Sequence, residues 1–529
     1  MFKYRPSKAV ILALVLVMTC TAMIVIARAS NVRDSMMLFQ DVMTKIREEY
    51  VDRVDIDKLI YGAIRGMLDT LDPHSQFLTK KQYDDLMIST HGSFGGLGIE
   101  IDIRNDWLTV IAPIEGTPAA RAGIRGGDRV VKIDGKSTRG ISMNDAIEKL
   151  RGPKGTDVTI SIQREGEAEL LDYTITRDVI KIKSVPYAGM LDDKVGYVRL
   201  AQFSEDSGQE LRDAVNKLKA KGMQKMILDL RRNTGGLLTQ AIEVSEEFVK
   251  PGQVVVSTKG RYPEQDHEYL AGQRASGGDF PLIVLVDNTS ASASEIVAGA
   301  IQDLDRGLVV GIPSFGKGTV QSVMRLPGDN ALKLTTAKYY TPSGRCINKD
   351  EEPSEDSAII QSPDAKADSG LAYHTLGGRT VYGGGGIHPD IEVKQDDVPK
   401  IATGLARQGL VFEFAVHYAA THKDVEDQNI SNHAALMKEF QDFLKSKNFQ
   451  YTDADFAEGQ DFVDVMLRSE IARKIWGDEA AYKVAIEGDT QLQRTADLLK
   501  KAGSLSDLFK EAVEASAPAA EHAPAGATR

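Results

Sequence analysis

Short apolar strands alternate with amphipathic helices between residues 195 and 345, and this alternation restricts the fold more than any other feature of the chain. The predicted buried strands are VGYVRLAQF, QKMILDL, PLIVLVDN and GLVVGI. The predicted helices between them are GQELRDAVNKLKAKG, LLTQAIEVSEEFV and SASASEIVAGAIQDL. Such alternation is typical of an α/β core, which we assign to residues 181–395. A hydrophobic share of 42% and a charged share of 26% are those of a globular protein.

The segments on either side of this core have different patterns and predict further domains in the 529-residue chain. Residues 31–90 have apolar side chains at helical spacing, whereas residues 91–180 combine glycine-rich turns with short strands. Residues 400–512 return to helical spacing, and the Ala/Pro-rich composition of residues 513–529 predicts a disordered tail. Inside the core, residues 350–375 are polar and indicate a loop insertion. The expected class is therefore a multidomain α/β (α+β) protein.

The N-terminus has the pattern of an export segment. Lys3, Arg5 and Lys8 precede an uncharged run from Ala9 to Ala27. A run of this length can span a bilayer, which favours an uncleaved anchor in a bacterial-type inner membrane with the rest of the chain facing the periplasm. The alternative is a signal peptide cleaved after Ala29, because an A-x-A pattern ends there, and the product would then be soluble in the periplasm.

Charge and cysteine content argue against two classes of function. The net charge of −12, without a basic cluster, argues against nucleic-acid binding. The two cysteines are Cys20 and Cys346, and the chain has neither a CxxC nor an HExxH pattern, so no metal site is expected. His74 in the turn LDPHSQF is a lone histidine, for which a structural role is favoured.

A lysine between two glycines is the first candidate for chemistry. The stretch GIPSFGKGTVQSV has almost the spacing of a phosphate-binding P-loop, but Gly318 stands where that loop needs Ser or Thr. The residues that follow predict strands where a P-loop needs a helix. Lys317 therefore needs another role. A buried lysine can lose its charge and act as a base, although a solvated loop lysine would give the same pattern.

A run of small residues, DNTSASASEIVAGAIQD, lies upstream at the end of another predicted strand. A serine hydroxyl at such a turn can point into a cleft, and N–H groups at the helix start can hold an oxyanion. Ser290, Ser292 and Ser294 are all candidates by residue type, and a helix N-cap is the alternative reading. Gly235 and Gly236 in DLRRNTGGLL form either a further nest of N–H donors or an ordinary strand-to-helix turn.

Together these motifs resemble those of the carboxyl-terminal processing peptidases, the tail-specific protease family with a Ser/Lys dyad. The matching motifs are LDPHSQFL, FGGLGIEI, GTPAARAGIRGGDRVVKIDG, DLRRNTGGLL, NTSASASEIVAGAIQD, FGKGTVQ, KYYTPSGRCI and GIHPDIEV. They occur in family order and cover about residues 31–395. Each motif is weak alone, but the ordered set is specific. The chain departs from short family members in the insertion 350–375 and in the helical region 400–512.

The resemblance implies roles for individual residues. Ser292, the middle serine of SASAS, would be the nucleophile, and Lys317 of FGKG would be the base that takes its proton. Gln321 would support the lysine. Residue type does not exclude Ser290 or Ser294, and it is the family motif that selects Ser292.

The resemblance also implies a crotonase/ClpP-like core with an oxyanion hole and no metal or organic cofactor. The oxyanion donors would be the amide of Ala293 and one amide from Gly235 or Gly236.

The segment 91–180 resembles a PDZ domain, which adds a peptide strand to a sheet edge and holds its C-terminal carboxylate in backbone amides. Those amides would come from Gly95, Gly96, Leu97 and Gly98. Ile99 and Ile124 would line a pocket for an apolar last side chain, and the core of the domain is the other interpretation, above all for Ile124.

The sequence thus predicts an exported serine endopeptidase that engages unstructured protein C-terminal tails. A second subunit or an adaptor protein is a further candidate partner, docking on the helical region 400–512. One alternative is a non-catalytic, membrane-anchored PDZ scaffold, which would need only the glycine loop. Another is a crotonase-like acyl-CoA enzyme, against which the export segment argues because CoA is cytoplasmic.

Overall fold

The computed structural model describes residues 32–273, 279–349, 370–422, 425–426 and 430–516. They fall into two compact units: a first unit of residues 32–79 and 323–334, and a second unit made of the other described residues. The predicted anchor or signal segment, most of the 350–375 insertion and the tail from residue 517 on lie outside the described residues, whereas residues 513–516 of the predicted disordered tail belong to a helix that ends at Ser516. Along the described parts of the chain, no helix is both long enough and apolar enough to cross a membrane.

The first unit is helical with a short strand pair. Residues 32–49 are helical, and α2 spans Ile56–Asp69. The Asp55 carboxylate caps α2, because it accepts hydrogen bonds from two backbone N–H groups of the first turn at 3.0 and 3.4 Å. After the predicted turn, β1 (Gln76–Leu78) pairs antiparallel with the beginning of β18 (Ala331–Tyr340). This confirms the helical pattern seen in the sequence.

The second unit begins with α3 (Lys80–His91) and a β-rich domain. The domain contains β2 (Ser93–Gly96), β3 (Ile99–Arg104), β4 (Trp107–Pro113), α4 (Pro118–Arg121), β5 (Arg129–Ile133), β6 (Lys136–Ser137), α5 (Met143–Leu150), β7 (Asp157–Gln163), β8 (Leu171–Thr176) and β9 (Asp178–Lys181). The strand order is β3-β4-β5-β7-β8, with β6 on β5 and a separate β2–β9 pair. Among the described strands, β3 pairs with β4 alone and is therefore an edge.

The α/β core predicted from the alternation is present. Its elements are β10 (Tyr187–Met190), β11 (Val195–Arg199), α6 (Ser207–Ala220), β12 (Lys225–Asp229), α7 (Leu238–Glu246), β15 (Leu282–Val286), α8 (Ala293–Asp303), β16 (Leu308–Gly311) and β21 (Ile391–Glu392). They form the sheet β10-β11-β12-β15-β16-β21. Only β10 pairs antiparallel with its neighbour, whereas the pairs from β11 to β21 are parallel.

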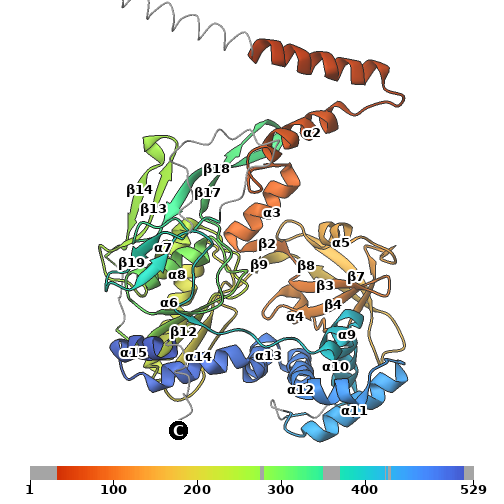
Figure 1. Ribbon diagram of the computed structural model, residues 1–529. Helices are drawn as coiled ribbons and strands as arrows, with labels where there is room; N and C mark the ends of the chain where they lie inside the picture. The colour runs from red at the N-terminus through yellow and green to blue at the C-terminus, as the bar shows by residue number, and fades with distance from the viewer. Residues whose placement is uncertain (1–31, 274–278, 350–369, 423–424, 427–429, 517–529) are drawn as a thin grey trace, which may run out of the picture. The chain divides into compact units, whose positions relative to one another are not determined.

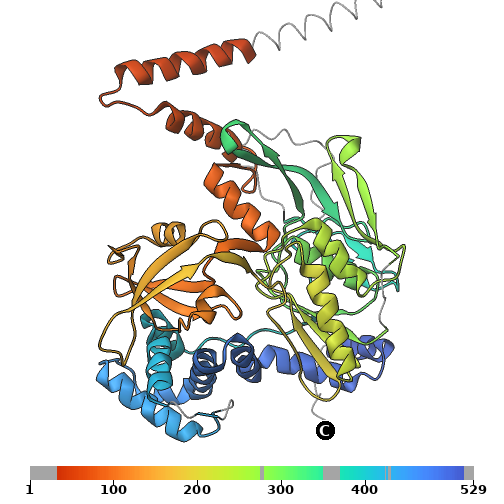
Figure 2. The same cartoon turned by 180° about the vertical axis from the view of Figure 1, so that it is seen from behind.

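Helices cover both faces of this sheet (Figures 1 and 2). Side chains alternate between the faces along each strand, so Met226 and Leu228 pack with α6, α7 and α8, whereas Ile227 packs with α14 (Thr490–Lys501) and α15 (Leu505–Ser516). A sheet buried on both faces has continuous apolar strands. This is why runs such as LIVLV in β15 carry no polar residue.

The helical region predicted after residue 400 has two different roles. Its first helices are α9 (Lys400–Gln408), α10 (Leu410–Thr421), α11 (His433–Ser446), α12 (Asp453–Trp476) and α13 (Asp478–Ala485). The helices α9 to α12 enclose an apolar core of their own, which includes the fully buried Phe414 and Phe440, and α13 packs on α12. The last two helices, α14 and α15, instead supply the second layer of the core sheet. The sequence pattern did not separate these two groups of helices.

Two further strand groups complete the described chain. A strand group beside the core contains β13 (Val254–Gly260), β14 (His267–Leu270), β17 (Thr319–Arg325) and the later part of β18. In it, Thr258 of β13 lies opposite Tyr339 of β18. A separate hairpin is formed by β19 (Ala372–His374) and β20 (Thr380–Tyr382).

Candidate active site

Ser292 lies in the turn that joins the buried strand β15 to α8. Its backbone has φ 56° and ψ −114°, a left-handed φ that a residue with a Cβ rarely adopts. Such strain persists only where the surroundings hold it, and it is common at functional sites. The side chain is half-buried, and α8 begins at the next residue, Ala293. A serine hydroxyl is thereby presented beside the N-terminus of a buried helix.

The hydroxyl groups of the two neighbouring serines form structural hydrogen bonds. Ser290 and Ser294 are completely buried. The Ser290 hydroxyl donates to the Leu230 carbonyl at 2.8 Å, and the Ser294 hydroxyl donates to the Asn233 carbonyl at 2.8 Å. Both contacts reach the turn after β12 and tie the two strand ends together. The geometry therefore favours Ser292 over the other two candidates, a distinction that residue type could not make.

A buried glutamate joins the turn of Ser292 to the loop of Lys317. Glu295 is fully buried in the first turn of α8. Its Oε2 accepts the backbone N–H of Ser292 at 2.7 Å and that of Lys317 at 3.0 Å. Its Oε1 accepts the Ser314 hydroxyl at 2.6 Å and the Gly316 N–H at 2.7 Å. One carboxyl group thus holds the backbone of both proposed dyad residues.

The sequence analysis did not identify Glu295. The signal was present, because Ser292 followed by Glu295 has the S-x-x-E spacing of a helix N-terminus, but the contacts of Glu295 with the Lys317 loop are long-range.

Burial raises the pKa of the Glu295 carboxyl, while the hydrogen bonds from Ser314, Gly316, Ser292 and Lys317 act in the opposite direction. The carboxyl group therefore keeps its proton to a higher pH than an exposed glutamate does.

Replacing Glu295 by glutamine should cost both stability and activity. The amide NH₂ would face two of the four donors, and each unpaired buried donor costs about 1–3 kcal/mol. We expect kcat to fall by roughly 10- to 100-fold, because small displacements of catalytic groups have effects of this size. The exposed Glu264→Gln is the matched control and should leave both properties unchanged.

The pH dependence of stability provides a second test of the role of Glu295. Its pKa is raised above the value of 4.5 for a free glutamate, so the folded state binds the proton more tightly than the unfolded state. The contribution of Glu295 to stability should therefore decline as pH rises from about 4.5 through the raised pKa, and this slope should vanish in Glu295→Gln. Thermal midpoints measured across that range test the sign. An unchanged slope would contradict the role of the buried carboxyl.

Tyr339 is a second contributor that the sequence analysis missed. This buried side chain comes from β18, and its hydroxyl donates to the Lys317 carbonyl oxygen. Burial raises the pKa of Tyr339 well above its usual value, and Glu295 adds to the effect, while a hydrogen bond with the Ser292 side chain opposes it. The Tyr339 hydroxyl therefore lies between the serine side chain and the backbone of the lysine.

Gln321 lies on β17, four residues after Lys317. Its side-chain NH₂ donates to the Thr319 hydroxyl at 2.8 Å and more weakly, at 3.5 Å, to the Thr335 hydroxyl. The side chain is thus oriented by two threonines of the neighbouring strands β17 and β18. These contacts describe what holds Gln321, and its support of Lys317 stays a prediction.

The expected oxyanion donors come from the start of α8 and from the glycine turn after β12. Ala293 is the first residue of α8, so its N–H is one of those that the helix itself leaves without a partner. Gly235 lies so close that an added Cβ would approach the Ser292 Cβ to 2.8 Å, which explains why a glycine is needed. The Gly235 N–H donates to Asn233 Oδ1 at 2.9 Å. This makes the Gly236 amide the better candidate of the two.

The glycine loop predicted to bind tails leads into the edge strand of the β-rich domain. Gly95 and Gly96 belong to β2, Leu97 is buried, and Gly98 has φ 77° with Thr117 packed against it. Ile99 follows at the start of β3 and is half-buried. Ile124 is buried in the apolar core of the domain, which matches the second of its two interpretations. The unpaired edge of β3 is the geometry that strand addition requires.

A half-buried serine on a strained turn, beside a helix N-terminus and a glycine turn, is the arrangement of a serine-type peptidase. Comparison with known families supports this class. Peptidase family S41 matches residues 194–355, and the PDZ domain matches residues 109–164. The activating protease CtpB N-terminal domain matches residues 25–82, and the probable PDZ-protease C-terminal helical domain matches residues 401–455.

Several known proteins are similar to this chain. The carboxy-terminal-processing protease of Bartonella bacilliformis is 45% identical over 313 residues, which cover 58% of this chain and 71% of the relative. The carboxy-terminal processing protease CtpA of Bacillus subtilis is 36% identical over 306 residues, covering 58% and 65%. A solved photosystem II D1 C-terminal processing protease is 28% identical, with a TM-score of 0.36 over 68% of this chain and 92% of that one.

The chain therefore belongs to the carboxy-terminal processing proteases of peptidase family S41. It is a PDZ-containing endopeptidase and a serine-type hydrolase. The family, the mixed α/β fold and the enzyme class predicted from the sequence motifs are confirmed.

Proposed function

We propose that this chain cleaves protein C-terminal tails with Ser292 as the nucleophile and Lys317 as the base, and that its PDZ domain recognises the tail. The observation that carries the proposal is the shared Glu295 carboxyl group, which binds the backbone N–H of both residues and so brings the two loops together. The N–H groups of Ala293 and Gly236 are the proposed oxyanion donors. Gln321 is the proposed support of the lysine.

The chemistry follows from these positions. The neutral Lys317 amine takes the Ser292 hydroxyl proton while Oγ bonds to the scissile carbonyl carbon, and the oxyanion donors bind the developing charge. The C–N bond then breaks, and the leaving amine takes the proton from Lys317. The ester that remains is hydrolysed by a water that the same lysine deprotonates, which regenerates the serine hydroxyl.

Tail recognition is assigned to the edge of β3. A peptide added as a strand there would place its terminal carboxylate at the backbone amides of the Gly95–Gly98 loop. Ile99 and Ile101 are half-buried residues of β3 that pack against the domain core, and they would face the apolar last side chain of the peptide. The terminal carboxylate is the group that distinguishes a tail from any other unfolded segment.

Amidating the C-terminus of a tail peptide should therefore lower kcat/KM. Hydrogen bonds to a charged group contribute about 1.5–3 kcal/mol, so we expect a loss of roughly 10- to 100-fold. The measurement compares free and amidated forms of one unstructured peptide, cleaved well upstream of its end.

Denatured casein, whose cleavage can begin without a particular tail, serves as the control for intact chemistry. Equal cleavage of the free and amidated peptides would show that the PDZ domain is a gate or spacer and does not capture the terminus. If amidation weakens binding of the peptide but neither the peptide nor casein is cleaved, the result would instead favour the alternative of a non-catalytic scaffold.

We further propose that the chain is exported and held at a membrane by its N-terminal segment. The support is Lys3, Arg5 and Lys8 before the uncharged run Ala9–Ala27. Fractionation of expressing cells tests this proposal: the intact chain should remain in washed membranes, whereas recovery of a shortened soluble form would favour cleavage after Ala29.

A further inference from the structure

Arg231 lies in the motif DLRRNTGGLL, directly after the core strand β12, and all five N–H groups of its guanidinium have acceptors. The Nε donates to Asp229 Oδ1 at 3.0 Å, and Nη2 donates to Asp229 Oδ2 at 2.7 Å and to Asp489 Oδ2 at 2.6 Å. The Nη1 donates to Asp489 Oδ1 at 3.1 Å and to Gln491 Oε1 at 2.8 Å. Asp229 comes from the same strand end, but Asp489 and Gln491 lie more than 250 residues later in the sequence.

Asp489 and Gln491 are held in place by α14. Asp489 is the N-cap of this helix, and its Oδ1 accepts the Leu492 N–H at 2.9 Å. Gln491 is buried and donates to the Val393 carbonyl at 2.6 Å. At the other end of α14, the Lys225 ammonium of β12 donates to the carbonyls of Leu499 and Lys500. The helix is therefore docked on the core sheet at both ends, and the position of the Asp489 carboxylate is defined.

Arg199, Arg231 and Asp229 form a buried charge cluster around the end of β12, and its charges balance only when Asp489 is included. The buried Asp229 contacts Arg231 and Arg199, and it accepts the Tyr197 hydroxyl at 2.7 Å. Burial alone would raise the pKa of Asp229, but the two arginines and the tyrosine hold it below its usual value. Two cations face Asp229 and Asp489, so removing the second carboxylate leaves an uncompensated positive charge in a buried site. Such a charge is strongly unfavourable.

The Arg231 backbone lies between two contacts to the turn of Ser292. On one side, the Leu230 carbonyl accepts the Ser290 hydroxyl. On the other, the Asn233 carbonyl accepts the Ala291 N–H at 3.1 Å as well as the Ser294 hydroxyl. Gly235, which lies within contact distance of Ser292, follows two residues after Asn233. A shift of Arg231 would therefore move the glycine turn and the serine turn together.

We propose that Asp489, with Gln491, is a positioning residue of the active site, so that the C-terminal helix α14 sets the alignment of the oxyanion glycines with Ser292. The proposal rests on the function proposed above, in which Ser292 is the nucleophile. The helical region after residue 400 then has a defined part in catalysis: its last helices hold the turn that binds the oxyanion, beyond their packing against the sheet.

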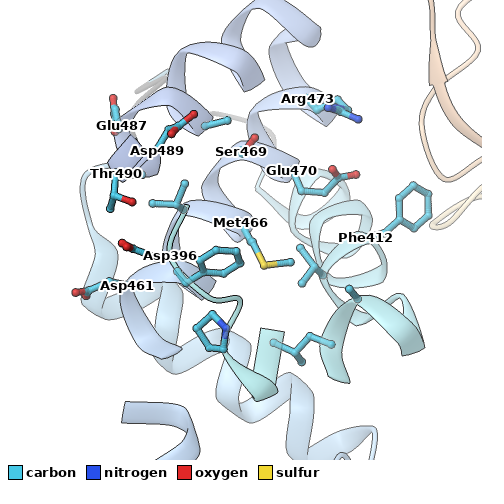
Figure 3. A pocket seen from close by; sticks show the side chains of 18 of the residues that line it. Asp396, Phe412, Asp461, Met466, Ser469, Glu470, Arg473, Glu487, Asp489 and Thr490 are labelled. Atoms are coloured by element: carbon cyan, nitrogen blue, oxygen red, sulfur yellow. The ribbon is translucent and has the colours of Figure 1, made fainter. Parts of the chain in front are cut away.

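Asp489 is well suited to an isosteric test. Its side chain is 20% exposed, and Figure 3 shows it beside Glu487 and Thr490 at the wall of a cavity of about 850 Å³. A neutral side chain of the same size can therefore be introduced without overpacking. Asp497 lies on the same helix, is exposed and pairs with Lys500 of the same helix at 3.2 Å, so it is a matched control.

The experiment measures kcat and KM of Asp489→Asn, Asp489→Glu and Asp497→Asn on one unstructured tail peptide. We expect kcat of Asp489→Asn to fall by about 10- to 100-fold with KM changed less than about twofold, since the oxyanion donors act in the transition state while tail binding is remote. Asp489→Glu, which restores the charge, should recover part of the loss. Asp497→Asn should behave as the parent protein.

Three outcomes overturn the inference: wild-type kcat in folded Asp489→Asn, a change confined to KM, or an equal loss in Asp489→Asn and Asp489→Glu. If circular dichroism shows that Asp489→Asn is unfolded, Gln491→Met decides, because it keeps every charge and removes one bond to Arg231; unchanged kcat in that variant also overturns the inference. Ser292→Ala is run in parallel. Activity in that variant refutes the proposed nucleophile, whereas an inactive Ser292→Ala beside a fully active Asp489→Asn refutes the positioning role alone.

Discussion

Ser292→Ala should abolish proteolysis while leaving the fold intact. The hydroxyl is the proposed nucleophile, and loss of a nucleophile of this kind lowers kcat by at least about 10⁴-fold. The side chain is half-buried and is not part of the apolar core, so thermal stability should change little. Cleavage of casein and of a tail peptide, followed by gel electrophoresis and mass spectrometry, measures the loss. Circular dichroism confirms that the variant is folded.

Ser290→Ala and Ser294→Ala are the matched controls in the same turn. Each removes a buried hydroxyl that donates to the turn after β12, which should cost about 1–3 kcal/mol of stability. The fraction that remains folded should still cleave. The assignment of the nucleophile fails if Ser292→Ala keeps parental activity, or if activity disappears only in Ser290→Ala or Ser294→Ala.

Lys317→Arg should be nearly as inactive as Lys317→Ala, with a loss on the order of 10³-fold or more in kcat. General-base assistance contributes about 10²–10⁴-fold, and an arginine remains charged at every usable pH, so it cannot take the serine proton. Because the lysine must lose its proton before it can act, the kcat/KM of the parent protein should rise toward alkaline pH. Initial rates across a pH series, in a range where the protein stays folded, test both statements.

The backbone contacts of Lys317 give this experiment a clear control. Its N–H donates to Glu295 and its carbonyl accepts the Tyr339 hydroxyl, and neither contact uses the side chain. The loop should therefore keep its position in both variants, with the thermal midpoint close to that of the parent. Substantial activity in Lys317→Arg would show that the lysine acts as a structural cation and that another group is the base.

Local patterns in the sequence were sufficient for the fold class and the proposed dyad motifs. Strand and helix spacing between residues 195 and 345 predicted the α/β core, because buried parallel strands must be continuous apolar runs separated by helices. The PDZ domain in the 91–180 segment was implied by the family resemblance of its motifs, and the family comparison confirms it. Ser292 and Lys317 were selected by the resemblance of two short motifs to those of the family, because residue types alone left Ser290 and Ser294 open.

Contacts between distant segments depended on the tertiary structure. The three serines are similar in sequence, and only the tertiary structure shows that the hydroxyl groups of Ser290 and Ser294 are bound to the turn after β12. The four hydrogen bonds of Glu295 join residues that lie on different strand ends, so its S-x-x-E spacing fits a helix cap but contains no information about the lysine loop.

The C-terminal helices show the same difference between what the sequence predicts and what the tertiary structure decides. Their helical spacing was evident from the sequence, since an apolar stripe needs only neighbouring residues to be recognised. That α14 covers the core sheet, and that Asp489 binds Arg231, followed from chain topology, which brings together residues more than 250 positions apart. Periodicity shows that a helix has an apolar face. Which surface buries that face, and which buried charge its N-cap balances, is decided only when the whole chain has packed.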